Sequence, residues 1–169
     1  MRETFVAIDF ETADYGADSA CAVALVRVEN GHVVSRAARL IRPPRRYFQF
    51  SYIHGITWRD VQREPRFAEV WPSLRPMLEG ATFLAAHNAA FDRRVLEACC
   101  RAAGLDSPGL PFECTVRLAR RTWGVRPTKL PNVCDYLGLS LRHHDPASDA
   151  EACALIVVRA SQAGLQKTG

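Results

Sequence analysis

The order of apolar and polar residues predicts strands at the start of this chain. Residues 4–10 are almost continuously apolar, the pattern of a strand that is covered on both faces. Residues 22–28 and 32–41 are also predicted strands, and Asn30-Gly31 between them is a strong signal for a tight hairpin turn. Residues 42–52, rich in arginine and proline, are expected to form a loop.

The rest of the chain alternates helical segments with short apolar ones. Further strands are expected at residues 82–86 and 112–115. Helices are expected at residues 58–63, 68–78, 89–103, 116–122, 130–137 and 146–163. An antiparallel start followed by β-α-β-α units predicts an α/β fold, a mixed sheet with helices on both faces.

Two acids lie at the carboxyl end of the first predicted strand. Side chains alternate along a strand, so Asp9 and Glu11 fall on one face, roughly 6.5–7 Å apart at Cα. At that separation one carboxylate can bridge two cations about 3.5–4 Å apart while the other binds one of them. Taken alone, such a pair is more often a capped or salt-bridged strand end.

A third acid opens the helix predicted at residues 89–103. Asn88 is a suitable N-cap and Gly104 a suitable stop, which places Asp92 in the first turn. Asp92 falls in line with Leu96 on the stripe that faces the core. An acid in a first turn also gains from the helix dipole, so this position alone leaves both interpretations open.

The fourth acid opens the last predicted helix. Asp145 is a candidate N-cap and Pro146 fits the first helical position, so Asp149 leads an apolar line that faces the core. His144 lies just before the helix, where its near-neutral pKa suits proton transfer at the same site. A lone histidine is more often a surface or core residue, and His143 is interpreted in that way.

These four acids lie among apolar residues, where an unpaired carboxylate is costly to bury. We therefore expect one shared site in which a divalent metal neutralises them. The chain has 169 residues, 48% hydrophobic and 24% charged, which predicts a single domain over residues 1–169. A net charge of +4 is compatible with a nucleic-acid partner.

The cysteines and the apolar segments bear on the compartment. The six cysteines show no C-x-x-C spacing, which favours reduced thiols over disulfides or zinc. No signal peptide and no apolar segment of membrane-spanning length is recognised in the sequence. A cytoplasmic location without membrane contact is expected.

The three acidic segments resemble the three exonuclease motifs of the DEDDh 3′–5′ exonucleases. This family includes the proofreading epsilon subunit of bacterial DNA polymerase III, ribonuclease T and oligoribonuclease. The matching segments are residues 9–12 (DFET), 87–92 (HNAAFD) and 144–149, in the same order. Residues 53–57 (IHGIT) also resemble a segment that borders the nucleotide pocket in epsilon-like members. The resemblance spans residues 5 to about 158, with Ala13 as a small departure.

This resemblance implies a ribonuclease H-like five-stranded fold and a two-metal mechanism. By analogy, two Mg²⁺ or Mn²⁺ ions would be ligated by Asp9, Glu11, Asp92 and Asp149. His144 would take a proton from the attacking water, and Glu11 would lie near the terminal 3′-hydroxyl. The products would be nucleoside 5′-monophosphates.

The resemblance also points to substrate-binding residues and partners. The candidates for binding the last nucleotide are Phe10, Thr12, His54, Asn88 and Phe91. For the two phenylalanines a core position is at least as well supported. The substrate would be a nucleic acid with a free 3′ end. Single-stranded DNA is favoured, RNA is the alternative, and a DNA polymerase is a candidate partner. A non-catalytic binding domain is less favoured because all five site residues are present.

Two basic segments are further candidates for contacts with nucleic acid. The first consists of Arg39, Arg42, Arg45 and Arg46, followed by Tyr47 and Phe48. The second consists of Arg117, Arg120, Arg121, Trp123, Arg126 and Lys129. Such segments are more often solvated surfaces. If one binds substrate, the first is favoured, because its loop precedes the His54 segment.

Overall fold

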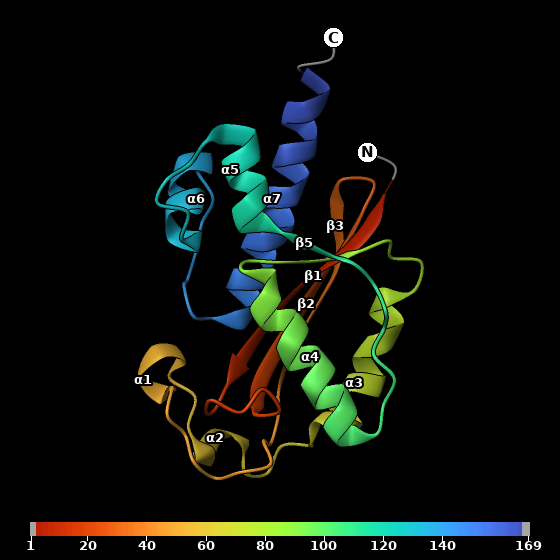
Figure 1. Cartoon of the computed structure of the whole chain (residues 1–169), viewed down its shortest axis with the longest axis vertical. Helices are drawn as coiled ribbons and strands as arrows, with labels where there is room; N and C mark the ends of the chain where they lie inside the picture. Colours follow the sequence, from red (N-terminus) through yellow and green to blue (C-terminus); the bar gives the residue numbers. More distant parts are fainter. Residues whose placement is uncertain (1–2, 167–169) are drawn as a thin grey trace.

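A five-stranded mixed sheet forms the centre of the computed structural model, which describes residues 3–166 (Figure 1). The strands are β1 (Thr4–Thr12), β2 (Ala20–Glu29), β3 (His32–Leu40), β4 (Leu84–Ala86) and β5 (Phe112–Cys114). They are ordered β3-β2-β1-β4-β5. The first three strands pair antiparallel, and β4 and β5 run parallel to β1. The predicted mixed sheet is confirmed.

Helices pack on both faces of this sheet. They are α1 (Ser51–His54), α2 (Trp58–Val61), α3 (Phe67–Leu74), the 3₁₀ helix η1 (Arg75–Leu78), α4 (Ala89–Ala103), α5 (Thr115–Trp123), α6 (Leu130–Leu137) and α7 (Pro146–Gln166). Phe5 and Ala7 of β1 join the core formed with α5, α6 and α7. Val6 and Ile8 join the opposite core, with α3 and α4. The predicted alternation of β1 is therefore confirmed.

Local sequence accounts for where the elements begin and end. Asn30 and Gly31 have φ values of 52° and 81°, which suit the turn that joins β2 to β3. The single helix expected at residues 68–78 is divided into α3 and η1, and Pro76, which has no N–H to donate, lies at the start of η1. α4 and α6 have the predicted bounds.

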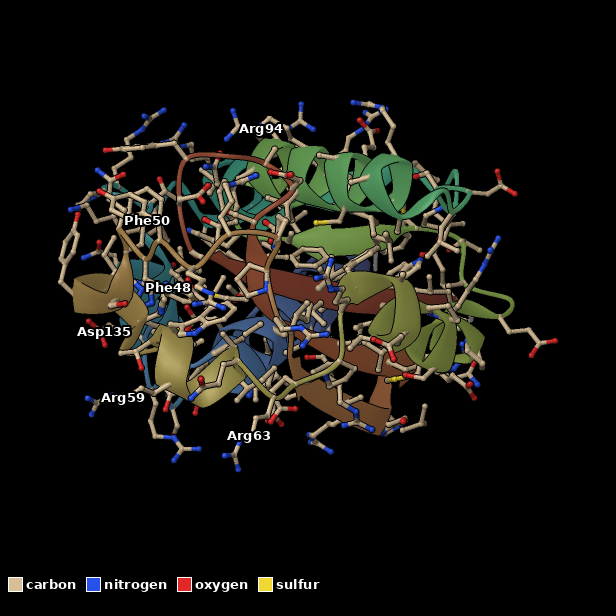
Figure 2. The ribbon with its side chains drawn as sticks, turned by 90° about the horizontal axis from the view of Figure 1, so that it is seen from below. Phe48, Phe50, Arg59, Arg63, Arg94 and Asp135 are labelled. Atoms are coloured by element: carbon tan, nitrogen blue, oxygen red, sulfur yellow. The ribbon has the colours of Figure 1, made fainter. Side chains whose placement is uncertain are left out.

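The loop predicted at residues 42–52 is only partly correct, because α1 begins inside it at Ser51. Phe48 and Phe50 lie on the segment that leads from β3 to α1 (Figure 2). Phe48 packs beside Ala13 and Cys21, and Phe50 makes an edge contact with Tyr15, with ring centroids 4.9 Å apart. The segment is thereby fixed near the carboxyl end of β1.

Because β4 is short, the end of β1 is left unpaired on one side, and the site lies there. β4 pairs with β1 only at Val6 and Ala7, so the last residues of β1 have no strand on that side. The first turn of α4 occupies this place, and the Phe10 N–H donates to Asp92 Oδ1 at 3.0 Å. Acids from β1 and α4 are thus brought together where β1 and β4 end.

In the described part of the chain, no helix is long and apolar enough to cross a membrane. All six cysteines are free, and five of them are buried. The two outermost parts of the domain predicted over residues 1–169, residues 1–2 and 167–169, lie outside the described residues.

Candidate active site

The predicted carboxylates meet at the carboxyl ends of β1 and β4. Asp9 and Glu11 from β1 and Asp149 from α7 line one cleft of about 450 Å³. Asp92 is buried behind them, where it accepts the Phe10 N–H. The other residues lining the cleft are Ile53, His87, Asn88, Phe91, Val116, Thr128, Lys129, Leu130, His143 and His144.

The four carboxylates are all difficult to ionise in the metal-free protein. Burial, followed by repulsion from Asp92 and Glu11, raises the pKa of Asp9 well above its ordinary value. Burial raises the pKa of Glu11 to about 7 and that of Asp92 to about 8. Burial also raises the pKa of Asp149. Charged forms at this place need a compensating positive charge.

The donor atoms fit divalent metal ions. Asp9 Oδ2 and Asp149 Oδ1 are buried and have no hydrogen-bond partner among the described residues. Such orphaned buried oxygens are rare in proteins, and each one needs an explanation. Carboxylate oxygens are the donors that hard divalent cations prefer. All four acids therefore carry donor atoms that suit a metal ion, and Asp9 and Asp149 each have a buried oxygen without a hydrogen-bond partner among the described residues.

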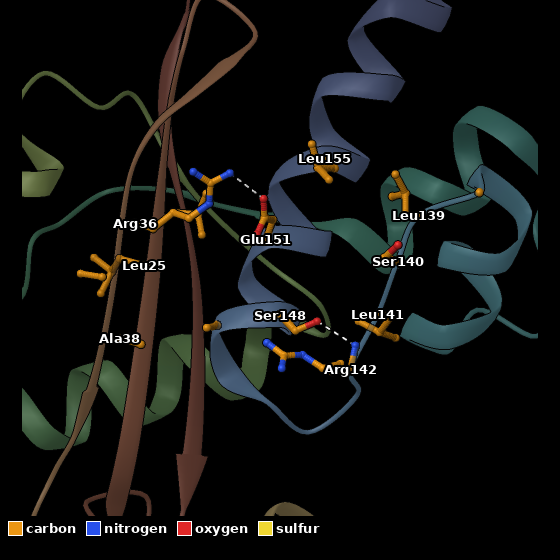
Figure 3. A pocket seen from close by; sticks show the side chains of 14 residues that line it. Leu25, Arg36, Ala38, Leu139, Ser140, Leu141, Arg142, Ser148, Glu151 and Leu155 are labelled. Atoms are coloured by element: carbon orange, nitrogen blue, oxygen red, sulfur yellow. Dashed lines mark hydrogen bonds and ion pairs between the residues drawn. The ribbon is translucent and has the colours of Figure 1, made fainter.

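The loop before α7 contributes two histidines rather than one. The backbone N–H of His144 donates to Asp149 Oδ2 at 3.2 Å, and His143 Nδ1 lies 3.0 Å from the same oxygen. The two rings stack with centroids 3.8 Å apart. The loop is closed onto α7 by Ser148 Oγ, which accepts the Arg142 N–H at 2.8 Å (Figure 3). The ring of His143 and the backbone of His144 are thus placed beside Asp149.

His143, interpreted from the sequence as a surface or core residue, is exposed and also contacts Asp149. It lines the cleft, and its ligand nitrogen, that of His144 and an Asp149 oxygen all lie within 4.8 Å of one another. Two adjacent histidines give no sequence signal for which side chain will face an acid several residues later. The backbone decides, since His144 has a positive φ of 68° that turns the loop.

The predicted substrate residues fall into two groups. Asn88 and Phe91 line the cleft. Asn88 starts α4 with φ 65° and makes no side-chain cap bond, so the predicted N-cap bond is absent while the helix start is correct. Phe10 is 2% exposed and belongs to the core on the opposite face, in agreement with its alternative interpretation. Thr12 is buried at the end of β1.

His54 joins the α1 segment to the end of β1. Its Nδ1 accepts the Ile56 N–H at 3.1 Å, so its Nε2 carries the proton and donates to the Thr12 carbonyl at 3.1 Å. Burial lowers the pKa of His54, which favours this neutral form. Both ring nitrogens are occupied, and the ring lines a neighbouring hollow together with His144. Its position makes it a support of the site.

His87 was not singled out in the sequence, although it begins the second motif segment. Its Nδ1 lies 2.8 Å from Thr115 Oγ1, and its Nε2 lies 3.0 Å from the Thr128 carbonyl. Burial lowers the pKa of His87 to about 4, so it is neutral at pH 7. It ties the end of β4 to the start of α5 and to the segment before α6.

Comparison with known proteins agrees with this geometry. The family model RNase_T, described as exonuclease, matches residues 6–157. The chain belongs to this exonuclease family. The exonuclease domain is 34% identical over 161 residues to the PolC-type DNA polymerase III of Thermotoga petrophila, covering 92% of this chain and 12% of the relative. It is 32% identical over 163 residues to the 3′–5′ exonuclease DinG of Bacillus subtilis, covering 92% and 17%.

The chain therefore spans less than a fifth of the length of these curated relatives. Among solved structures, Exonuclease X in complex with 5′ overhanging duplex DNA matches with a TM-score of 0.75 and 28% identity, over 94% of this chain and 91% of that one. The nuclease domain of 3′hExo, a DEDDh family member bound to rAMP, matches with a TM-score of 0.82 and 20% identity, over 96% and 93%.

These matches confirm the expected DEDDh relationship, the ribonuclease H-like fold and the assignment as a 3′–5′ exonuclease domain. The family depends on divalent metal, in agreement with the buried oxygens of Asp9 and Asp149 that have no hydrogen-bond partner among the described residues.

Proposed function

We propose that this exonuclease domain removes nucleotides one at a time from the 3′ ends of single-stranded DNA and releases nucleoside 5′-monophosphates. The observation that carries the proposal is a cleft lined by Asp9, Glu11, Asp149 and two histidines, next to the buried Asp92. The pKa values of all four carboxyl groups are raised. Asp9, Glu11, Asp92 and Asp149 would hold two Mg²⁺ or Mn²⁺ ions. When bound, the ions supply positive charge and make water more acidic.

His144 is the proposed general base. Burial and the neighbouring His143 lower the pKa of His144, so at pH 7 its imidazole is neutral and can accept a proton from water. The water oxygen bonds to phosphorus while the bond to the 3′ oxygen of the preceding nucleotide breaks. His143 would keep Asp149 in place through its 3.0 Å contact.

The terminal nucleotide would lie between the end of β1 and the start of α4. Glu11 is proposed to contact its 3′-hydroxyl, and Asn88 and Phe91 to flank it, because these residues line the same cleft. Phe10, Thr12 and His54 would support this pocket from behind. A 3′-hydroxyl bound by Glu11 would explain a requirement for a chain end.

The proposed preference for DNA is supported by curated relatives that are more similar in sequence to this chain than 3′hExo is. Exodeoxyribonuclease 10 of Escherichia coli is 38% identical over 104 residues, 60% of this chain and 40% of that protein. The PolC-type relatives make a proofreading role beside a DNA polymerase the proposed context. An exoribonuclease is the second candidate, because 3′hExo carries a ribonucleotide in its structure. A domain that binds without cleaving is disfavoured by the complete set of acids.

The direct experiment uses 5′-labelled single-stranded DNA, duplex DNA and RNA of one sequence, each with Mg²⁺ or Mn²⁺. We expect a descending ladder from the 3′ end, fastest on single-stranded DNA, and a block by a 3′-phosphate. The Asp9→Asn variant controls for contaminating nuclease. Faster degradation of RNA would establish the second candidate instead, and cutting of circular single-stranded DNA would contradict the exonuclease assignment.

A further inference from the structure

A second groove adjoins the acidic cleft, between the beginnings of α4 and α5. Its volume is about 430 Å³. It is lined by Asn88, Ala89, Ala90, Arg93, Phe112, Cys114, Val116, Arg117 and Arg120, and we call it the arginine groove. Asn88 and Val116 line both hollows, so a strand that leaves the cleft on this side enters the groove directly.

The charge of the arginine groove is opposite to that of the cleft. Three arginines and no acidic residue line it. Arg120 is oriented by a bond from its Nε to Thr128 Oγ1 at 2.8 Å, and Arg93 is held by Glu97 at 2.9 Å. α4 and α5 both begin at this groove, so the positive ends of two helix dipoles add to the field.

Cys114 gives a separate sign of this positive field. Burial raises the pKa of its thiol, but backbone N–H groups of Arg117, Ala89, Val116 and Asn88 lower it further than burial raises it. The other five cysteines are buried and have raised pKa values. Negative charge is therefore favoured in this groove.

In the first basic segment of the sequence, two arginines contact other side chains of the protein. Arg45 is held by Asp14 and Asp18 at 2.8 and 2.6 Å, and Arg46 lies over the Trp58 ring at 5.5 Å. These contacts tie Arg45 and Arg46 to their own surroundings. Arg39 of the same segment lines the hollow beside His54 and His144, so the preference for that segment stays a prediction. Part of the second basic segment lies beside the cleft.

We propose that the arginine groove binds backbone phosphates of the substrate strand on the 5′ side of the bond that is cleaved. The inference rests on the proposed function, since it takes the acidic cleft as the place of the 3′ end. A single strand that leaves the cleft would first contact the metal-binding acids and then the arginines of the groove, because the two hollows adjoin. The apolar sides of Phe112 and Val116 offer contact to its bases or sugars.

The test removes two groove charges and compares them with two matched charges elsewhere. The groove variant is Arg93→Gln with Arg117→Gln. The control is Arg94→Gln with Arg101→Gln, two exposed arginines of α4 that lie outside the groove. Both variants lower the net charge equally. Two substrates are used, a single-stranded DNA hexamer and the p-nitrophenyl ester of thymidine 5′-monophosphate, which occupies the cleft alone.

We expect the groove variant to raise KM for the hexamer about tenfold relative to the control, while hydrolysis of the ester stays unchanged. The slope of log affinity against log salt should fall by about 1.4, since each single-strand phosphate contact contributes about 0.7. A bound hexamer, at saturation judged by fluorescence anisotropy, should also slow alkylation of Cys114 by N-ethylmaleimide in the wild-type protein.

Three results would overturn the inference. The first is a hexamer KM equal to that of the control, the second is an equal loss on the ester, and the third is a bound hexamer that leaves the alkylation rate of Cys114 unchanged. Failure of the proposed function looks different. In that case the wild-type protein hydrolyses neither the hexamer nor the ester, while anisotropy and Cys114 protection still report whether the groove binds the strand.

Discussion

Two pairs of carboxyl groups lie close together in the sequence, but the protein shifts their pKa values in opposite directions. Asp9 and Glu11, near the end of β1, have raised pKa values because they are buried near other acids. Asp14 and Asp18, in the turn that follows, have lowered pKa values because Arg45 donates hydrogen bonds to both. Arg45 forms ion pairs with both acids of the second pair, whereas Asp9 and Glu11 form no ion pair with any of the described residues.

This difference separates structural from functional acids. Asp14 also accepts the Gly16 N–H at 2.7 Å, so its oxygens are satisfied within the turn. Asp9 Oδ2 is buried without a partner among the described residues. A buried carboxylate with no internal partner is destabilising unless a ligand supplies the charge. The comparison thus supports the proposal that the acids of the cleft bind metal.

The largest effect on activity is expected from substitutions of the acids that line the cleft. Asp9→Asn and Asp149→Asn should each reduce nuclease activity to the assay background, since each removes a metal ligand. The melting temperature without metal should stay equal or rise, because repulsion and burial of charge are relieved. Asp18→Asn is the control and should retain activity within twofold. Activity above half of wild type in either cleft variant would sink the site assignment.

The next effect separates the base from the metal ligands. His144→Ala should slow turnover by about 10²–10⁴ and leave Mn²⁺ affinity nearly unchanged. Asp149→Ala should instead weaken Mn²⁺ binding. At raised metal concentration the wild-type rate should fall below a pKa lower than 6.5, as His144 becomes charged, and this acidic limb should be absent in the variant. If His144→Ala loses metal as severely as Asp149→Ala, His144 is a ligand.

A smaller effect is expected on stability as a function of pH. The pKa of Glu11 is raised from 4.5 to about 7, so the unfolded chain loses this proton first. Its stabilising contribution is complete below pH 4.5 and is lost as pH rises through about 7. Without metal, Glu11→Gln should therefore melt at the wild-type temperature in acid and above it at neutral pH. A difference that shrinks with rising pH would contradict the assigned direction.

The smallest effect is expected from a substitution of Arg45, the partner of Asp14 and Asp18. Arg45→Met should lower the free energy of unfolding by about 1 kcal/mol, a low value because its side chain is 44% exposed to water. Activity should stay within twofold of wild type, as urea denaturation and a nuclease assay on the same preparation can show. A large loss of activity would mean that the turn holding Asp14 and Asp18 also shapes the cleft.

The sequence predicted those parts of the fold that depend on local patterns. Asn30-Gly31 fixed the hairpin, and helix formers between Asn88 and Gly104 fixed α4, because turn and cap preferences act within a few residues. α1 was missed because residues 51–54 have no apolar period, and they are held in place by the contact of His54 with Thr12.

The site was predicted as a set of residues but not in all its geometry. The acids stood out because carboxylates on apolar stripes are rare. The role of His143 and the neutralisation of Arg45 depend on contacts across 6 and 31 residues, which no local pattern contains. The unpartnered oxygens of Asp9 and Asp149 likewise required the folded arrangement.

The central claim is that the cleft acids form a divalent metal site, and metal-linked proton release tests it most directly. Calorimetric titration with Mn²⁺ in two buffers of different ionisation enthalpy measures both binding and released protons. Near pH 7 we expect two ions per chain and a net proton release, because Glu11 and Asp92 have pKa values of about 7 and about 8 before metal binds. The release should shrink as pH rises above 8. Absence of Mn²⁺ binding, or binding that releases no protons at any pH, would contradict the account.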